Sequence, residues 1–264
     1  MLDNLHGGGN KLTYDPIFLK IVEQANQEFS GWDFSFISQT GRVQSDSLPW
    51  SYGSRLLCYM QSSNRMLDMG TGGGEFLSHM KPLPHDVYAT EAYKPNIPVA
   101  KERLQPIGVQ VVEIDDDTKL PFSNAYFDLI ANQHESYSVN EVRRLLHDKG
   151  VFITQQVGGL DCKEINAIFD VPLNDEYICW NLKRAADEIR EKDFHIAYSQ
   201  EAYPIQRFYD VGALIYYLKA IPWQVPGLKV WNELDTLYTI HKIIQSAGYF
   251  EVTQHRFIII AEAL

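Results

Sequence analysis

Short apolar runs alternate along most of the chain with stretches in which apolar residues recur every three or four positions. Short runs of this kind are typical of buried strands, and the longer spacing is typical of amphipathic helices. The predicted strands cover 66–69, 87–90, 109–114, 126–132, 151–157, 194–198 and 251–263. The predicted helices cover 16–29, 75–80, 138–149, 182–189, 210–221 and 237–247. Strands separated by helices predict an α/β protein.

Local signals fix the ends of two helices. The sequence Ser138-Val-Asn-Glu141 is a capping box that opens one helix, and Gly150 predicts where that helix stops. The sequence Asp161-Cys-Lys-Glu164 predicts a second capping box.

Residues 1–50 form a predicted N-terminal helical and aromatic arm. A glycine-rich stretch at 6–10, predicted to be flexible, precedes the helix at 16–29. Four aromatic residues follow this helix: Trp32, Phe34, Phe36 and Trp50. They either pack the arm against the main domain or roof a substrate pocket.

The segment Gly70-Thr-Gly-Gly-Gly74 predicts a tight turn between a strand and a helix. Glycines let a ligand approach the backbone and tolerate positive φ, and the following helix N-terminus favours an anionic or polar group. A plain connecting loop is the alternative. Glu91, about twenty residues further on at the end of the next strand, supports a nucleotide site because an acid there can accept both ribose hydroxyls.

The glycine spacing separates two cofactors. A dinucleotide fingerprint, G-x-G-x-x-G, needs a third glycine at position 75, where this chain has Glu75. The spacing found, G-x-G-x-G, suits S-adenosylmethionine, which has no pyrophosphate to cradle. A nicotinamide dehydrogenase is therefore disfavoured.

Several motifs in the same order carry a family resemblance. The run Leu67-Asp-Met-Gly-Thr-Gly-Gly-Gly-Glu75 resembles motif I of the class I S-adenosylmethionine-dependent methyltransferases. The runs 120–130 and 143–154 resemble the segments leading into strands four and five of that family. The series covers roughly residues 60 to 160 and is most similar to the type 11 subgroup, which includes quinone-biosynthesis methyltransferases. Lys149-Gly150 departs from the Pro-Gly-Gly usual in the subgroup.

The resemblance implies a Rossmann-like seven-stranded sheet with helices on both faces and an antiparallel last strand. The methyltransferase domain would span 51–264, with an insertion at about 201–232 above the cofactor site. The implied cofactor is S-adenosylmethionine, which leaves as S-adenosylhomocysteine. The residues expected to bind it are Asp68, Gly70, Thr71, Gly72, Gly74, Glu91, Asp115, Asp116 and Asn132. Asp117 competes for the adenine contact, because sequence places a strand end only to within about a residue.

Composition limits the partners. The formal net charge is −11, from 23 basic and 34 acidic residues, and no basic run is longer than Arg143-Arg144, which disfavours a nucleic-acid partner. No apolar run is long enough to span a membrane, and no signal pattern is present. Cys58, Cys162 and Cys179 form no C-x-x-C pair. We therefore expect a cytoplasmic monomer or homodimer with no membrane span and no metal site.

Two residues are candidates for catalysis. Methyl transfer from a sulfonium depends mainly on alignment, and the acceptor can also require a general base. His134 and Glu135 follow strand four at the carboxyl edge of the sheet, where open α/β proteins hold their ligands. The alternative for His134 is a structural hydrogen bond to a neighbouring loop. Tyr137 either orients an acceptor or is a contact at the helix start.

The sequence thus predicts a methyltransferase that acts on a small-molecule acceptor. An rRNA or tRNA base methyltransferase is one alternative, disfavoured by the acidic charge and by an N-terminus without zinc-binding cysteines. A non-catalytic S-adenosylmethionine-binding protein is another, favoured if no acceptor pocket adjoins the methyl group.

Overall fold

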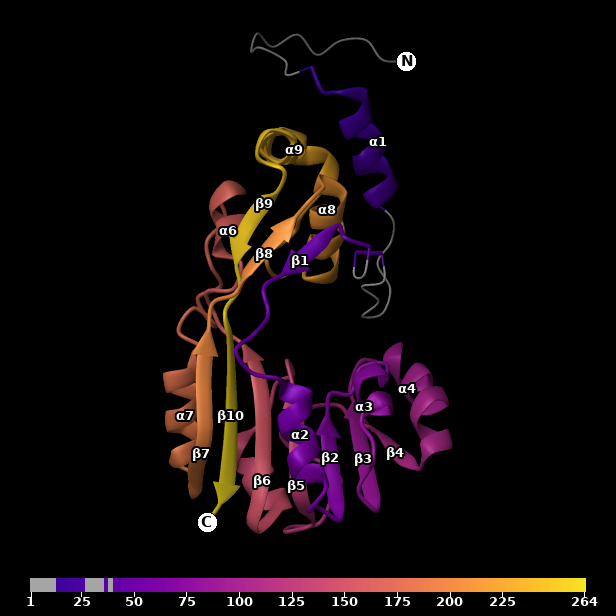
Figure 1. The fold of residues 1–264 in the computed structure, drawn as a ribbon, viewed down its shortest axis with the longest axis vertical. Helices are drawn as coiled ribbons and strands as arrows, with labels where there is room; N and C mark the ends of the chain where they lie inside the picture. The colour runs from indigo at the N-terminus through magenta and orange to yellow at the C-terminus, as the bar shows by residue number, and fades with distance from the viewer. Residues whose placement is uncertain (1–12, 27–35, 38–39) are drawn as a thin grey trace. The chain divides into compact units, whose positions relative to one another are not determined.

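The computed structural model describes residues 13–26, 36–37 and 40–264, which divide between two units of the chain (Figure 1). The sheet unit contains Ser45–Gln206 and Val252–Leu264. The helical unit contains Arg207–Glu251 together with the described N-terminal residues up to Gln44. Each unit is described by itself.

A seven-stranded sheet forms the sheet unit (Figure 1). Its strands, in spatial order, are β4 (Val109–Glu113), β3 (Asp86–Glu91), β2 (Arg65–Met69), β5 (Phe127–Gln133), β6 (Leu146–Val157), β10 (Arg256–Ala263) and β7 (Phe194–Ala202). The pairs from β4 to β6 are parallel, whereas β10 runs antiparallel to both β6 and β7. The predicted Rossmann-like sheet with an antiparallel last strand is confirmed.

Helices cover both faces of this sheet because successive strand residues point to opposite sides. Met66 and Ile258 belong to a core shared with α2 (Tyr52–Met60), α3 (Glu75–His79) and α4 (Asn96–Leu104). Their chain neighbours Leu67 and Phe257 belong to a second core, shared with α5 (Val139–Leu145) and α7 (Leu182–Arg190). Strands buried on both faces explain the continuous apolar runs of the sequence.

Two predicted helix signals are partly wrong. Ser138 caps α5 as predicted, but the helix ends at Leu145 rather than at Gly150. Leu146 instead begins β6 and pairs with Phe127, so burial in the sheet outweighs the glycine stop signal. The second capping box is also wrong: the N-cap of α6 (Lys163–Ile168) is Cys162 rather than Asp161, and its side chain makes no capping hydrogen bond to the start of the helix.

The predicted last strand, 251–263, is two strands in two sheets. β9 (Phe250–Thr253) belongs to a three-stranded sheet in the order β1–β8–β9, with β1 (Val43–Ser45) and β8 (Ile205–Phe208). β10 begins only at Arg256. The backbone N–H of His255 bonds to Asp161 at 2.7 Å, which takes this residue out of a strand ladder.

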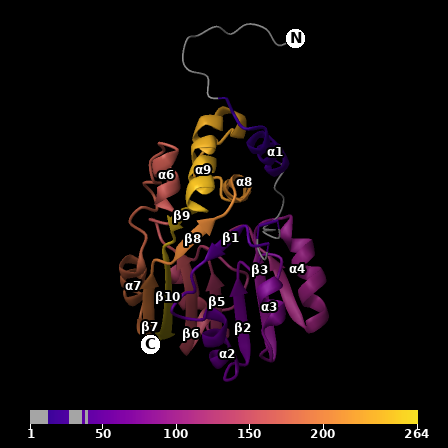
Figure 2. The same ribbon diagram turned by 45° about the horizontal axis from the view of Figure 1, so that its top comes forward.

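The helical unit packs α1 (Pro16–Ala25), α8 (Val211–Ala220) and α9 (Leu234–Ala247) side by side (Figure 2). Phe18 is fully buried against the rings of Tyr238 and His241. Arg42 forms a two-pronged ion pair with Asp210, at 2.6 and 2.7 Å. The predicted arm and the predicted insertion lie far apart in the sequence, but both contribute residues to the helical unit.

Some predictions for the arm fall beyond the described residues. The stretch 6–10, the end of the helix predicted to reach 29, Trp32 and Phe34 all lie there. Phe36 packs against Tyr216 within the helical unit, with ring centroids 4.9 Å apart. Trp50 belongs instead to the core of the sheet unit. None of the described helices has the length and apolar character that a membrane crossing requires.

Candidate cofactor and active site

The glycine turn joins the carboxyl end of β2 to the start of α3. The N–H of Thr71 donates to the carbonyl of Thr90 at 3.0 Å, which ties the turn to β3. A side chain on Gly74 would approach Leu104 to 2.7 Å, so this glycine permits α3 to pack on α4. Gly72 has φ +62°, and a methyl group there would meet no described atom within 4 Å. Gly72 therefore leaves an open side from which a ligand can reach the backbone.

Two buried carboxylates flank this turn. Asp68 is 6% exposed within β2, and burial raises its pKa to about 7. Glu91, 5% exposed at the end of β3, accepts the N–H of Tyr93 at 2.7 Å through Oε1. The two acids thus lie at the carboxyl ends of neighbouring strands, as the sequence predicts for a nucleotide site.

Several polar atoms beside these acids are buried without a hydrogen bond of ordinary geometry among the described residues. They are Tyr52 Oη, Thr71 Oγ1 and Thr90 Oγ1. Thr71 nevertheless lies close enough to Asp68 to offset part of the rise in the pKa of Asp68. Burial and then the charge of Asp68 raise the pKa of Tyr52, and the backbone of Asn132 lies close enough to Tyr52 to offset part of that rise. Buried polar atoms normally have partners, so this set fits a polar ligand that carries positive charge. The sequence did not predict a site role for Tyr52, because it lies in α2, before β2 and outside the motif of the glycine turn.

Glu135 belongs to the same group of acids. Its side chain lies against Gly70, so closely that a side chain at position 70 would collide with it. Burial raises the pKa of Glu135, and the charges of Glu91 and Asp117 add to the effect. One predicted catalytic residue is thereby placed beside the predicted cofactor turn.

Asn132 uses its side chain to shape the loop that holds Glu135. Its Oδ1 accepts from Thr154 Oγ1 at 3.0 Å and from Gln156 Nε2 at 2.7 Å, and its Nδ2 donates to the carbonyl of Ser136 at 3.2 Å. Gln156 also donates to the carbonyl of Glu135 at 3.0 Å. Asn132 is predicted to bind the cofactor, and these contacts give its side chain a structural task as well.

His134 hydrogen-bonds to Gln155, whereas Glu135 lies against Gly70. It has φ +61°, and its N–H donates to the carbonyl of Gln155 at 2.8 Å. Its Nε2 lies 3.0 Å from the side-chain nitrogen of Gln155. Desolvation by the surrounding protein and the charge of Arg256 lower the pKa of His134, so the imidazole is neutral at neutral pH.

The three acids after β4 differ in their surroundings. Asp116 is exposed and accepts the N–H of Thr118 at 2.8 Å, within its own loop; hydrogen bonds from Thr118 lower its pKa. Asp115 is exposed too, whereas Asp117 is half-buried and acts electrostatically on Glu135. Of the three, Asp117 is the one whose charge helps raise the pKa of Glu135. The sequence predicts Asp115 and Asp116 as cofactor residues, with Asp117 as the alternative.

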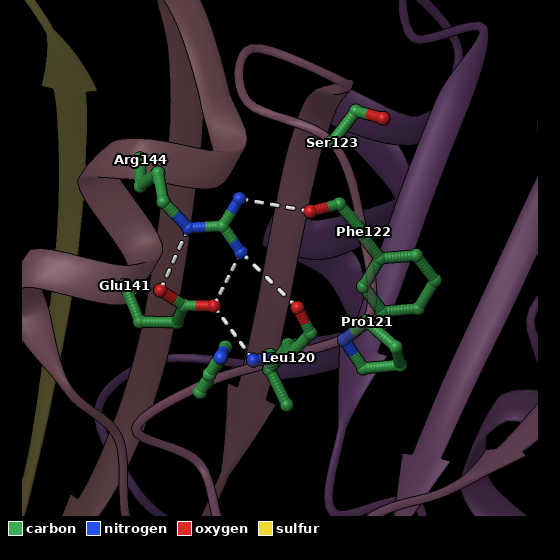
Figure 3. Close-up of a pocket in the computed structure, with 7 residues that line it drawn as sticks. Leu120, Pro121, Phe122, Ser123, Glu141 and Arg144 are labelled. Carbon is green, nitrogen blue, oxygen red and sulfur yellow. Dashed lines mark hydrogen bonds and ion pairs between the residues drawn. The ribbon is translucent and has the colours of Figure 1, made fainter.

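Two hollows in the sheet unit lie apart from these residues. One of about 560 Å³ is lined by 119–123, Glu141 and Arg144 (Figure 3). There Arg144 donates to the Glu141 carboxylate and to the carbonyls of Leu120 and Phe122, and it also reaches Asn124. Its donors are used in holding the 120–124 segment, so this is a structural contact. The other, about 490 Å³, lies around Asn64 and His147.

The remaining points from the sequence concern Tyr137, metal ligands and the cysteines. Tyr137 packs against Phe152, with ring centroids 5.0 Å apart, on the α5 face of the sheet, and its buried hydroxyl has no hydrogen-bond partner among the described residues. Within the described part of the chain, no three His, Cys, Asp or Glu side chains gather as metal ligands would. Cys58 and Cys179 are free thiols, and both are exposed.

The order and direction of the strands define the class I methyltransferase fold, and solved structures share it. The YcgJ protein of Bacillus subtilis is 16% identical with a TM-score of 0.56, over 80% of this chain and 97% of that one. A putative methyltransferase of Bacillus halodurans is 14% identical with a TM-score of 0.56, over 79% and 98%. A functionally unknown protein of Deinococcus radiodurans is 12% identical with a TM-score of 0.58, over 84% and 91%. No curated protein matches the sequence.

The family model described as a methyltransferase domain matches residues 67–154, from β2 through the glycine turn to β6. Residues 67–154 therefore match the methyltransferase-domain family, and the sheet that contains them has the class I methyltransferase fold; together they support S-adenosylmethionine-dependent methyl transfer. The match does not single out the quinone-biosynthesis members, so that part of the resemblance stays a prediction.

Proposed function

We propose that this enzyme methylates a small-molecule acceptor at the carboxyl edge of the seven-stranded sheet. The observation that carries the proposal is the open side of Gly72, flanked by the buried carboxylates of Asp68 and Glu91. An acidic, partly unpaired lining suits a cationic cofactor. It is a poor surface for a polyanionic substrate, in agreement with the net charge of −11.

The residues divide the work as follows. Glu91 would accept the ribose hydroxyls at Oε2, since its Oε1 already accepts the Tyr93 N–H. Asp68, with Tyr52 and Thr71 beside it, faces the positively charged methionine end. The open backbone of Gly72 lies against the ligand. Asp115 and Asp116, with Asp117 as the alternative, contribute on the adenine side.

S-adenosylmethionine, held by the residues above, would supply an activated methyl group on its sulfonium. The acceptor would form a bond to that carbon as the sulfur–carbon bond breaks, and the electron pair would stay on sulfur in S-adenosylhomocysteine. Glu135 then takes the proton that the acceptor loses, since its raised pKa brings the carboxylate closer to the basicity such a transfer needs. Water exclusion and alignment supply the rest of the rate enhancement.

Glu91→Ala tests the cofactor part of this proposal. We expect the affinity for S-adenosylmethionine, measured by calorimetric titration, to fall by at least about tenfold, because hydrogen bonds to a charged group contribute roughly 1.5–3 kcal/mol. Glu113 is the matched control: it pairs with Glu91 on the neighbouring strand and is exposed. Equal affinities for Glu91→Ala and Glu113→Ala would remove Glu91 from the site.

Cytoplasmic location and a monomeric or homodimeric state remain predictions from the sequence. The same holds for residues 201–232 as an insertion that serves the active site.

A further inference from the structure

A chain of hydrogen bonds with a fixed direction runs through Trp50, Gln155 and His134. Trp50 precedes α2, Gln155 lies in β6, and His134 follows β5. Trp50 Nε1 is 2.8 Å from Gln155 Oε1, and Gln155 Nε2 is 3.0 Å from His134 Nε2. Trp50 and Gln155 are 7% and 3% exposed, so water does not compete for the bond between them, while the bond from Gln155 to His134 is partly buried.

The direction follows from the one group that can only donate. The indole N–H of Trp50 has no acceptor capacity, so the oxygen of the Gln155 amide must face it. The amide nitrogen then faces His134, and it too can only donate. Nε2 of His134 must therefore offer a lone pair, which puts the imidazole proton on Nδ1.

The charges around His134 agree with a neutral ring. Desolvation of the ring lowers the pKa of His134, and the positive charge of Arg256 on β10 acts in the same direction. Glu135, the next residue, directs its carboxylate to Gly70 and to the N–H of Ser136 rather than to the imidazole. Among the residues that the structure describes, none accepts a hydrogen bond from Nδ1, and His134 is exposed.

We propose that His134 is a hydrogen-bond donor to the methyl acceptor rather than its general base. Its Nε2 is occupied by Gln155, and its Nδ1–H is offered to an oxygen atom of the acceptor, a hydroxyl, carboxylate or carbonyl close to the methylated atom. Trp50 and Gln155 are positioning residues, because they act only by fixing the tautomer of His134. The inference rests on the proposed function for the identity of the ligand, but the tautomer itself does not.

The tautomer is measured on the ligand-free protein by long-range 1H–15N correlation of the histidine rings. We expect His134 to show an unprotonated Nε2 and a protonated Nδ1, and His134→Gln assigns its signals. Two other histidines serve as internal references. His255 accepts the Leu160 N–H at Nδ1 and donates from Nε2 to Glu201, so it should show the opposite tautomer. His147 faces Asp128 and the Asp148 carbonyl with its two nitrogens, so it should carry both protons.

The variant Gln155→Glu tests the relay. A carboxylate still accepts from Trp50 but must also accept from His134, so Nε2 should become protonated, and the pKa of His134 should rise by about two units. A protonated Nε2 of His134 in the wild-type spectrum would overturn the proposal. So would a Gln155→Glu protein that folds and leaves the His134 signals unchanged.

The donor role is tested with phenol and acetate as oxygen probes and methylamine as the control, added to the protein with S-adenosylhomocysteine. We expect the oxygen probes to shift the Nδ1–H signal and methylamine to leave it in place. Shifts from neither oxygen probe would contradict the donor role. Failure of S-adenosylmethionine binding would instead contradict the proposed function while leaving the tautomer as measured.

Discussion

Replacing Gly72 with valine is expected to weaken the binding of S-adenosylmethionine by about a hundredfold, equivalent to about 2.7 kcal/mol. The added side chain would project into the open side of the turn, where a methyl group meets no described atom within 4 Å. It would not clash with the described residues, so apart from the backbone strain of a side chain at positive φ the loss should appear in the affinity. Calorimetric titration measures the affinity, and circular dichroism with thermal unfolding checks the fold.

Gly108→Val is the matched control for backbone strain. Gly108 has φ +88°, and, as at Gly72, a methyl group added there would meet no described atom within 4 Å. It precedes β4, at the edge of the sheet opposite the carboxyl ends of the parallel strands. Both variants carry the strain of a β-branched residue at positive φ, roughly 1–2 kcal/mol. If Gly108→Val weakened binding as much as Gly72→Val, strain rather than ligand contact would explain the loss.

Asp68 should make the affinity for S-adenosylmethionine depend on pH. With its pKa near 7 in the ligand-free protein, Asp68 is mostly protonated below that pH, and a cationic ligand favours the carboxylate. Binding must then release a proton, so we expect the affinity to rise about tenfold between roughly pH 6 and pH 8. Titrations in buffers with different ionisation enthalpies measure the released proton directly.

Asp68→Asn should flatten this pH profile and weaken binding. It should also stabilise the ligand-free protein at alkaline pH, because the ionised, buried carboxylate of Asp68 destabilises the folded state of the wild type. The pKa is raised from 3.8 when unfolded to about 7 when folded, so the unfolded chain holds fewer protons between these values and stability falls as pH rises. The effect is on the order of 2–4 kcal/mol. A pH profile of binding identical to that of the wild type would contradict the role of Asp68.

The strands and the two covered faces of the sheet were predictable because they follow from local patterns, whereas the seven-stranded sheet with its antiparallel last strand was implied by the family resemblance. Parallel strands covered by helices require apolar residues on both sides, and runs such as 66–69 and 151–157 have this character. The glycine turn and Glu91 were predictable for the same reason, since each lies at the end of a strand, where its residue type serves ligand binding.

The parts that were not predictable depend on contacts between distant residues. Trp50 and Gln155 are 105 positions apart, and no pattern in either segment indicates their hydrogen bond. The end of α5 at Leu145 follows from strand pairing of Leu146 with Phe127, which outweighs Gly150. The break between β9 and β10 follows from the bond between His255 and Asp161, again between distant residues.

The central claim is that the turn at Gly70–Gly74 and the acids beside it bind S-adenosylmethionine. Calorimetric titration with S-adenosylmethionine, S-adenosylhomocysteine and NAD tests it most directly. We predict micromolar binding of the first two and none of NAD. Binding of NAD alone would contradict the account, and so would the absence of binding by all three ligands.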